Sequence, residues 1–574
     1  MPIQNADITA TFDEIADLLE IEGANPFRVR AYRNGARTVQ GLGRDAETLV
    51  EQKFDFTRLP GIGKDLAAKI EELVRTGRCS ELQKLRKRVP AALSVLLKIP
   101  GLGPKRVALL HKELGINTQK QLLRALRLGR IRDLAGFGEK IERRILHAVE
   151  AQAQKKRRVP VATAAGSVDP LIGYLKQTKG VENVMVAGSY RRCTETVGDL
   201  DIVVTANRAS PVMDRFVAYN QVKEVISHGK TRTTIILKSG LQVDLRVVER
   251  ASLGAALQYF TGSKAHNLAI RRLGQQRRLK INEYGVFKGN KRVAGRTESS
   301  VYAAVALPYI APELRENRGE IEAARRNTLP KLVALSDLKG DLHCHTRASD
   351  GQNTIKEMAQ AARECGLRYL AITDHSKSPG VAHGLDTHAL LAQIAQINHL
   401  NEELQDIYLL KGIEVEILED GSLGLPDVIL AQLDMVIGAV HSKLDLSRRK
   451  QTHRIVRALN HRHFSILAHL SGRLIGERDP YEVDMVQLIR EARERGCFLE
   501  LNAQPQRLDL VDTHCKLARD EGVLIGIGSH AHQPGDFDNL RFGIGQARRG
   551  WLAAGDVLNT RPLRTVRKLL EGTM

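Results

Sequence analysis

The chain has 574 residues, roughly four times the ~150 residues of one ordinary domain, so several folding units are expected. Its composition, 43% hydrophobic and 27% charged, excludes a disordered, collagen-like or disulfide-stapled chain. The net charge of +21 is concentrated in residues 1–340, where 59 Lys and Arg face 35 Asp and Glu, which favours nucleic-acid binding over a generally basic, solvated surface.

No export or membrane signal is evident. The first twenty residues lack a basic start, and no stretch of about 18 uncharged apolar residues occurs. The six cysteines lie far apart without a CxxC pair, which argues against a disulfide framework or a thiolate zinc site. A reducing cytoplasm is the expected location.

Residues 1–158 are predicted to be helical and to bind DNA. A Gly-x-Gly turn that opens an amphipathic helix occurs three times, in LPGIGKDLAAKI from Leu59, IPGLGPKRVALL from Ile99 and LAGFGEKIERRI from Leu134. This unit resembles the helix-hairpin-helix, which presents backbone N–H groups to a DNA phosphate. The expected DNA-binding glycines are Gly61, Gly63, Gly101, Gly103, Gly136 and Gly138. One copy would also suit a turn between packed helices, but three copies in a basic segment favour backbone binding.

Residues 159–312 are predicted to form a mixed α/β domain with a carboxylate site, after a linker at KKRRVP. In GSYRRCTETVGDLDIVV, Asp199 and Asp201 lie two apart, so on a strand both side chains leave the same face. Asp244 lies in a later apolar strand. Three carboxylates facing one site suit two-metal phosphoryl transfer, whereas a GDxD motif alone also suits a solvated pair at a strand edge.

A charged helical bridge is predicted at residues 313–339, and residues 340–574 alternate strand-like and helical runs, which suits a seven- or eight-stranded β/α barrel. Fourteen of the 18 histidines lie in this last segment. Nine potential metal ligands follow its strands: His343, His345, Asp350, His375, Glu414, His441, His469, His530 and His532. A single HxH is usually incidental, but a packed core would not bury so many imidazoles without partners, so a transition-metal site is predicted.

The motifs GSYRR, GDLD, VDLRVV and YFTGS resemble, in order, the palm and nucleotide-binding motifs of family X DNA polymerases. The resemblance implies that Asp199, Asp201 and Asp244 bind two Mg²⁺ or Mn²⁺ ions, with Asp244 on the side that activates the primer 3′-hydroxyl. It implies these nucleotide-binding residues: Gly188, Ser189, Arg192, Gly198, Tyr259, Phe260, Gly262, Asn267 and Arg271. The turn from Tyr259 to Gly262 would contact the sugar and disfavour ribonucleotides.

The histidine pattern resembles the PHP domain, which implies a cluster of Mn²⁺ or Zn²⁺ ions and phosphoester hydrolysis. Bacterial family X polymerases typically carry this domain C-terminally as a 3′–5′ exonuclease. The expected protein is therefore a monomeric, nucleoid-associated repair polymerase that acts in base excision repair on gapped or nicked DNA with deoxynucleoside triphosphates. Its expected fold has a helix-hairpin-helix region, an α/β nucleotidyltransferase palm with a thumb, and a PHP barrel.

Several positions depart from the family pattern. Cys193 stands where glycine is common, so a loop with positive φ would be strained there and nucleotide affinity modestly altered. His530-Ala531-His532 replaces the usual Asp-Ala-His, and Leu470 replaces proline after His469; losing a carboxylate favours Zn²⁺ over Mn²⁺ and predicts a retuned or partly disabled site.

Two alternatives to the main hypothesis follow from these departures and from the barrel. One is a DNA-end-binding scaffold with weakened catalysis, and the other is a small-molecule phosphoesterase that resembles histidinol phosphatases. A lyase activity is a further option, because Lys69 matches the lysine that forms a Schiff base with deoxyribose phosphate in animal relatives. Asp65, however, replaces an accessory lysine there, and a lone helical lysine is more often a solvated cation or a phosphate contact.

Overall fold

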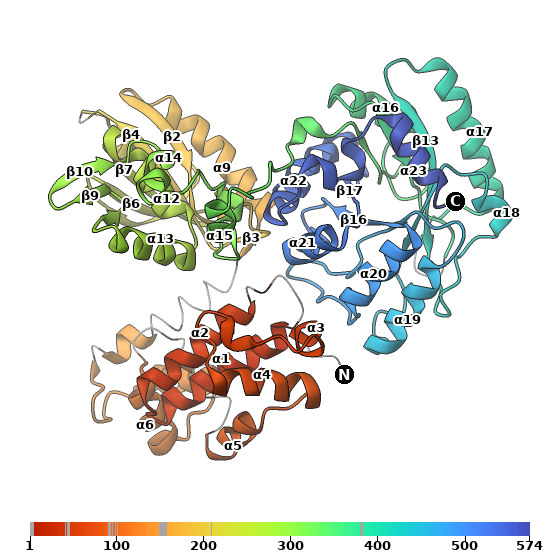
Figure 1. Cartoon of the computed structure of the whole chain (residues 1–574). Helices are drawn as coiled ribbons and strands as arrows, with labels where there is room; N and C mark the ends of the chain where they lie inside the picture. The colour runs from red at the N-terminus through yellow and green to blue at the C-terminus, as the bar shows by residue number, and fades with distance from the viewer. Residues whose placement is uncertain are drawn as a thin grey trace. The chain divides into compact units, whose positions relative to one another are not determined.

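The structure is a computed structural model that describes residues 5–40, 42, 46–89, 93, 96–97, 99, 102–139, 141–146, 149, 158–207, 209–378 and 383–574. The chain divides into two compact units, residues 1–158 and 159–574 (Figure 1). Within the described residues, no helix is long and apolar enough to cross a membrane.

The first unit is helical throughout its described residues. Its elements are α1 (Asn5–Ile21), α2 (Pro26–Gln40), α3 (Ala46–Glu51), η1 (Phe56–Arg58), α4 (Lys64–Thr76), α5 (Ser80–Arg88), α6 (Pro104–Leu114) and α7 (Gln119–Arg127). A single core runs from Phe12 and Tyr32 in the first helices to Leu110 and Ile145. In α4, for example, Leu66, Ile70 and Leu73 recur at helical spacing and are buried in this core, while Lys64, Asp65 and Arg75 are exposed.

The second unit begins with a five-stranded sheet that we call the palm. Its strand order is β2-β4-β7-β6-β5, with β2 (Val181–Val186), β4 (Asp199–Ala206), β5 (Val222–His228), β6 (Arg232–Leu237) and β7 (Gln242–Val248). The short strands β1 (Val159–Pro160) and β3 (Thr196–Val197) pair beside it, and its helices are α9 (Val161–Lys176), α10 (Gly188–Arg191), α11 (Val212–Val217) and α12 (Leu253–Thr261). The central strands β4 and β7 are parallel, and β4 buries Ile202, Val203 and Val204 in succession.

A second core follows, which we call the thumb. It contains α13 (Lys264–Gln276), α14 (Glu298–Ala304), η4 (Pro312–Leu314), α15 (Glu320–Arg325) and an antiparallel sheet of β8 (Lys280–Asn282), β9 (Gly285–Lys288) and β10 (Lys291–Ala294). The sequence predicted a bridge at residues 313–339, but Leu314, Ile321 and Ala324 are buried in the thumb core. The first half of that segment therefore packs into the thumb, because Leu314 of η4 and two apolar side chains on one face of α15 are buried there.

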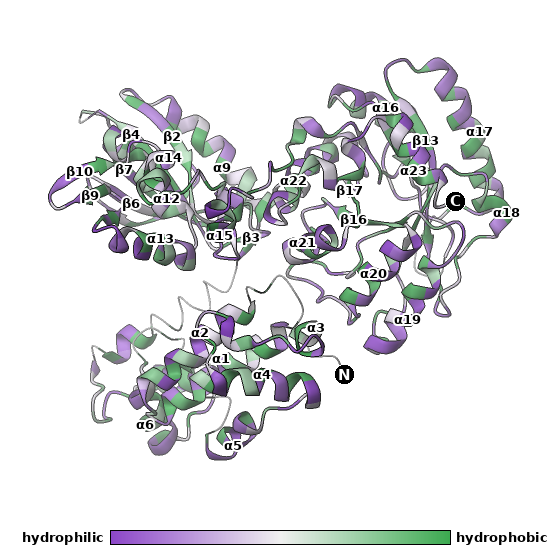
Figure 2. Ribbon diagram, in the orientation of Figure 1, coloured by the Kyte–Doolittle hydropathy of each residue, from purple (hydrophilic) through white to green (hydrophobic). Residues whose placement is uncertain are grey.

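The last part is a nearly closed parallel barrel of seven strands, in the order β11 to β17. The strands are β11 (Gly340–Asp341), β12 (Tyr369–Ile372), β13 (Tyr408–Glu416), β14 (Met435–Ala439), β15 (Ile466–Leu467), β16 (Phe498–Asn502) and β17 (Ile525–Gly528). The helices are α16 (Ile355–Glu364), α17 (Thr387–Glu403), α18 (Asp427–Leu430), α19 (Arg448–Leu459), α20 (Met485–Arg495), α21 (Asp512–Glu521), α22 (Leu540–Arg549) and α23 (Leu563–Glu571). The backbone N–H of His345 donates to the carbonyl of Ala531, which joins the first strand's end to the last. The predicted barrel is confirmed, with hydrophobic strands inside and hydrophilic residues prominent on the outer helices (Figure 2).

The barrel supplies side chains to both earlier cores of the second unit. Leu508, which follows β16, is buried in the palm core with Val161, Leu200 and Leu245. Trp551, two residues after the end of α22, is buried in the thumb core. The barrel is therefore packed against the palm and thumb through apolar side chains that it contributes to their interiors.

Candidate active sites

Three carboxylates meet on one face of the palm sheet. Asp201 of β4 lies opposite Asp244 of β7 in parallel register, and Asp199 points to the same face two residues earlier. Asp244 is 5% exposed and accepts hydrogen bonds from Thr234 and, at 3.3 Å, from Gln242. Burial, and then the charges of Asp199 and Asp244, raises the pKa of Asp201 to about 7. A cluster of carboxylates that resists its own ionisation is suited to bind divalent cations.

The loop before these carboxylates depends on a glycine. Gly188 has φ of 66° and begins α10, and a Cβ atom there would lie 2.7 Å from the carboxylate oxygen Oδ2 of Asp201. Any larger residue would therefore displace the carboxylate as well as strain the backbone. Ser189 follows in α10, and Gly198 directly precedes β4.

The predicted nucleotide-binding residues also lie near one another. The Asn267 amide donates to the carbonyls of Tyr259 at 2.6 Å and Gly262 at 3.1 Å, which ties the end of α12 to the start of α13. The guanidinium of Arg271 lies 5.1 Å from the centre of the Tyr259 ring. Phe260 meets Tyr259 edge to face. Arg192 donates through Nη1 to the carbonyl of Thr261 at 2.8 Å. The structure thus brings the loop from Gly188 to Arg192 up to the turn from Tyr259 to Gly262.

The helix-hairpin-helix glycines lie at helix starts. Gly63 is the N-cap of α4 and Gly103 the N-cap of α6, and neither would bring a Cβ within 4 Å of another residue. In the third copy, the Gly138 carbonyl accepts hydrogen bonds from the backbone N–H groups of residues 141 and 142. Gly61 and Gly136 have φ of 79° and 81°, while Gly101 lies outside the described residues. The open space beside Gly63 and Gly103 leaves their backbone accessible to a phosphate.

Lys69 is engaged on α4. Its Nζ lies 2.5 Å from Oδ1 of Asp65, one turn earlier, and its side chain is 15% exposed. Burial would lower the pKa of Lys69, but Asp65 and Tyr32 together outweigh burial and raise the pKa. A Schiff base requires a neutral amine, so this pairing disfavours the lyase option and favours a charged lysine.

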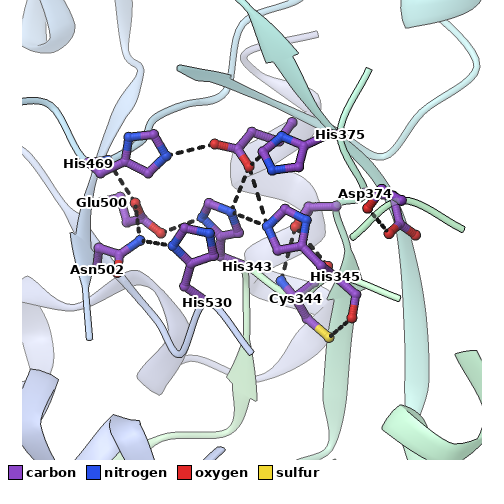
Figure 3. Close-up of polar contacts among 12 residues, drawn as sticks. His343, Cys344, His345, Asp374, His375, His469, Glu500, Asn502 and His530 are labelled. Carbon is purple, nitrogen blue, oxygen red and sulfur yellow. Dashed lines mark hydrogen bonds and ion pairs between the residues drawn. The ribbon is translucent and has the colours of Figure 1, made fainter. Parts of the chain in front are cut away.

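The barrel gathers seven of the nine predicted ligands into three overlapping groups whose potential ligand atoms lie within 4.8 Å of one another. These groups are His343, His345, Glu414 and His530; His345, Asp350 and His375; and His375, Glu414 and His441. His343 and His345 follow β11, and their Nε2 atoms face each other at 3.0 Å (Figure 3). Glu414 is shared by two groups and lies 2.7 Å from Nε2 of His469, which is outside the three groups. His532 is also outside them and lies 3.2 Å from Asp350.

Several ring nitrogens in this cluster are buried without a hydrogen-bond partner among the described residues. They are Nδ1 of His345, His375 and His469 and Nε2 of His441. A buried nitrogen without a donor or acceptor is costly unless a ligand satisfies it. Nδ1 of His345, Nδ1 of His375 and Nε2 of His441 lie 3.2 to 3.4 Å from a carboxylate oxygen of Asp350 or Glu414 without forming a hydrogen bond. Imidazole nitrogens placed beside carboxylates in this way fit divalent transition metals.

Sequence reasoning missed the residues that orient the ligands. Glu500 of β16 accepts a hydrogen bond from Nδ1 of His343 at 2.5 Å and from the backbone N–H of His469 at 2.8 Å. Glu416 plays the same part for Nδ1 of His441 at 2.8 Å. The one available signal was the presence of carboxylates inside apolar strands, one in CFLELN and two in GIEVEI, because a buried carboxylate requires a partner.

His530, the departure from the family pattern, lies inside the cluster. Its ring stacks on His343 with centroids 4.3 Å apart, and its Nδ1 lies 2.7 Å from the side-chain amide nitrogen of Asn502 (Figure 3). Burial, followed by the neighbouring His343 and His345, holds the pKa of His530 well below its usual value. The ring is therefore neutral and can offer Nε2 to a metal.

Five family models match successive segments of the chain, in the same order as the parts described above. A helix-hairpin-helix domain matches residues 3–79, a SAM-like helix-hairpin-helix tandem 93–151, a DNA polymerase beta palm 158–257, a DNA polymerase beta thumb 256–316 and a PHP domain 341–527.

Similar proteins cover the whole chain or the barrel alone. A protein of Bacillus subtilis (strain 168), named DNA polymerase/3′-5′ exonuclease PolX, is 38% identical over 98% of this chain and 99% of its own length. A probable phosphatase of Thermoanaerobacter sp. (strain X514) is 30% identical over 38% of this chain and 89% of its own. A probable phosphatase of Clostridium novyi (strain NT) is 26% identical over 35% of this chain and 83% of its own.

Proposed function

The chain belongs to the family X DNA polymerases that carry a C-terminal PHP domain, and we propose that it fills short gaps during DNA repair and processes 3′ ends with its barrel. The observation that carries the proposal is the placement of Asp199, Asp201 and Asp244 on one face of the palm. The histidine cluster in the barrel supports a second, separate chemistry on phosphoesters.

In the palm, Asp199, Asp201 and Asp244 would hold two Mg²⁺ or Mn²⁺ ions. When bound, these ions lower the pKa of the attacking hydroxyl and neutralise charge on the phosphate. Ser189 and Arg192 would bind the triphosphate, and the turn from Tyr259 to Gly262 would contact its sugar. Asn267 holds that turn in place through its two hydrogen bonds to backbone carbonyls.

In the barrel, the three ligand groups would hold Mn²⁺ or Zn²⁺, and His530 in place of a carboxylate favours Zn²⁺. When bound, such ions supply a nucleophilic hydroxide and polarise the phosphate. Glu500 and Glu416 fix the ring orientation of His343 and His441, so that the opposite nitrogen of each ring faces the cluster.

The test is nucleotide addition to a one-nucleotide gap with a 5′-phosphate, with Mg²⁺ or Mn²⁺. Asp244→Asn should lose at least about a hundredfold of the extension rate and keep 3′-end degradation, because the barrel is untouched. His343→Gln should lose degradation and keep extension. Matched controls are Asp214→Asn and His399→Gln, whose side chains are 79% and 70% exposed and should change neither activity.

Two outcomes would replace this proposal. Wild-type protein that binds the gap tightly but neither extends nor degrades it would be a DNA-end scaffold. The relatives named probable phosphatases support the second candidate, a phosphatase activity of the barrel. Release of inorganic phosphate from a small phosphomonoester, faster than from a DNA 3′-phosphate and dependent on His343, would establish that candidate instead.

A further inference from the structure

The barrel contacts the loop that precedes the palm carboxylates through α22 and through Arg473. Gly545 of α22 lies against Cys193, and a Cβ atom at Gly545 would come within 2.8 Å of the Cys193 Cβ. Arg473 of the barrel pairs with Glu195 of the same loop at 2.6 Å. The barrel thus contacts, at two points, the loop that contains Arg192, the residue proposed to bind the triphosphate.

Arg549, at the end of α22, makes the central contact. Its Nη1 donates to the backbone carbonyl of Arg192 and to Oε1 of Glu316, both at 2.9 Å, and its Nη2 donates to Asp512 at 2.7 Å. The Arg549 side chain is 6% exposed and that of Glu316 is 16% exposed. One residue of the barrel is therefore bound to the backbone of the loop and to a carboxylate of the thumb.

Glu316 passes this contact on to the Arg192 side chain. The same oxygen, Oε1, accepts a hydrogen bond from Nε of Arg192 at 2.9 Å. Arg192 also donates through Nη1 to the carbonyl of Thr261. Its Nη2 has no hydrogen-bond partner among the described residues, so the guanidinium is held from behind with one nitrogen left for a ligand.

The charged state of Glu316 depends on both arginines. Burial disfavours a charged carboxylate unless cations compensate for the lost water. Arg192 and Arg549 together keep the pKa of Glu316 below its usual value despite its burial. An oxygen shared by two guanidinium groups also fixes both in one geometry, because each is planar with directed donors. Removing either cation frees the other to move.

We propose that Arg549 is a positioning residue for nucleotide addition, which acts from the barrel through Glu316 and the Arg192 carbonyl to aim the Arg192 guanidinium at the incoming triphosphate. The inference rests on the proposed function, since it requires Arg192 to bind that triphosphate. It makes the barrel a part of the polymerase site as well as a site of its own.

The experiment measures KM and kcat for the incoming nucleotide on the one-nucleotide gap. Arg549→Met should raise KM about fivefold to tenfold with little change in kcat. The substitution loosens the Arg192 side chain, which holds the triphosphate, and leaves the three palm carboxylates in place. Arg549→Lys should recover part of the loss, since one ammonium group cannot serve all three acceptors. Arg548→Met is the matched control. Arg548 lies on α22 beside Arg549 and binds Glu313 of the thumb at 2.7 Å, but it has no contact with Arg192 among those described.

The decisive comparison uses Arg192→Met. In that background, Arg549→Met should leave KM unchanged, because its effect passes through the side chain already removed. A further rise in KM in the double variant, or an equal rise in Arg548→Met, would overturn the inference and indicate general damage to the contact. An Arg192→Met protein with unchanged KM would instead refute the proposed role of Arg192. Should Arg549→Met fail to fold, Glu316→Gln tests the same path, with the same expectation of no added effect beside Arg192→Met.

Discussion

Glu500 orients side chains of the histidine cluster, although it belongs to none of the three groups of potential metal ligands. It accepts hydrogen bonds from the His343 ring and the His469 backbone, which follow two separate strands of the barrel, β11 and β15. Burial would lower the pKa of His343, but Glu500 and Glu414 raise it to about 10, so the ring is a strong base at that position.

Glu500→Gln should therefore weaken metal binding and 3′-end degradation about 10- to 100-fold, because the His343 ring loses its charged partner. Calorimetric titration with Zn²⁺ and Mn²⁺ gives the affinity. Glu482→Gln, at an exposed position in the same part of the chain, serves as the control. An unchanged affinity would show that the His343 orientation is set by its ring stacking alone.

His530→Asp tests the charge of the cluster. The substitution restores a carboxylate, which should shift metal preference from Zn²⁺ toward Mn²⁺ and raise Mn²⁺-dependent degradation. The measurement is the degradation rate over a Mn²⁺ titration for both proteins. No gain in the variant would argue against a disabled site and would indicate that Asn502 and its neighbours have adapted to the imidazole.

At the scale of single elements, α22 is fitted to the loop that it contacts. Cys193 has φ of 55°, the left-handed conformation that disfavours side chains, and it faces a glycine on α22. Gly545 on α22 thus leaves room for the Cys193 side chain, at a loop position where relatives commonly have glycine.

Gly545→Ala should destabilise the second unit by about 1–3 kcal/mol, because its Cβ would overlap Cys193. Cys193→Gly combined with Gly545→Ala should recover most of that loss, since the first change vacates the space and relieves the positive φ. Urea unfolding of the two single variants and the double variant measures the coupling. Additive losses would mean that the two residues do not share a contact.

Elements that have a local sequence motif could be predicted from the sequence. Contacts between the barrel and the palm or thumb could not. The hairpins, the strand that carries Asp199 and Asp201, and the parallel barrel could be predicted because each has its own spacing or periodicity. The pairing of Glu316 with Arg549 joins residues 233 positions apart, and no local pattern encodes it. The packing of α15 into the thumb core was hard to predict for a related reason, because charged residues surround its few apolar positions that face the core.

For the whole molecule, stability against acid depends in part on His266, a buried thumb residue beside the turn from Tyr259 to Gly262. His266 is fully buried in the thumb between Glu320, at 2.6 Å, and the Tyr302 hydroxyl, at 3.0 Å. Burial lowers the pKa of His266, and Glu320 offsets only part of this effect. Below about pH 6.5 the unfolded chain binds a proton that the folded chain resists, so stability falls as the pH decreases toward the folded pKa.

His266→Gln should therefore reduce the loss of stability between pH 7.5 and pH 5.5, although it lowers stability at pH 7.5. The free energy of unfolding in urea, measured for both proteins at the two pH values, isolates this histidine from those of the barrel. An identical loss in both proteins would place the acid sensitivity elsewhere.

The burial of Leu508 in the palm core sets an order of events during synthesis. The palm strands leave the ribosome early, but their core includes a residue that follows β16, and the thumb core waits still longer for Trp551. Neither core is complete until most of the barrel has been translated. Nascent chains that stall before residue 508 will expose an apolar patch on the palm, which makes them targets for chaperones and proteases, whereas chains that pass residue 551 can close both cores at once.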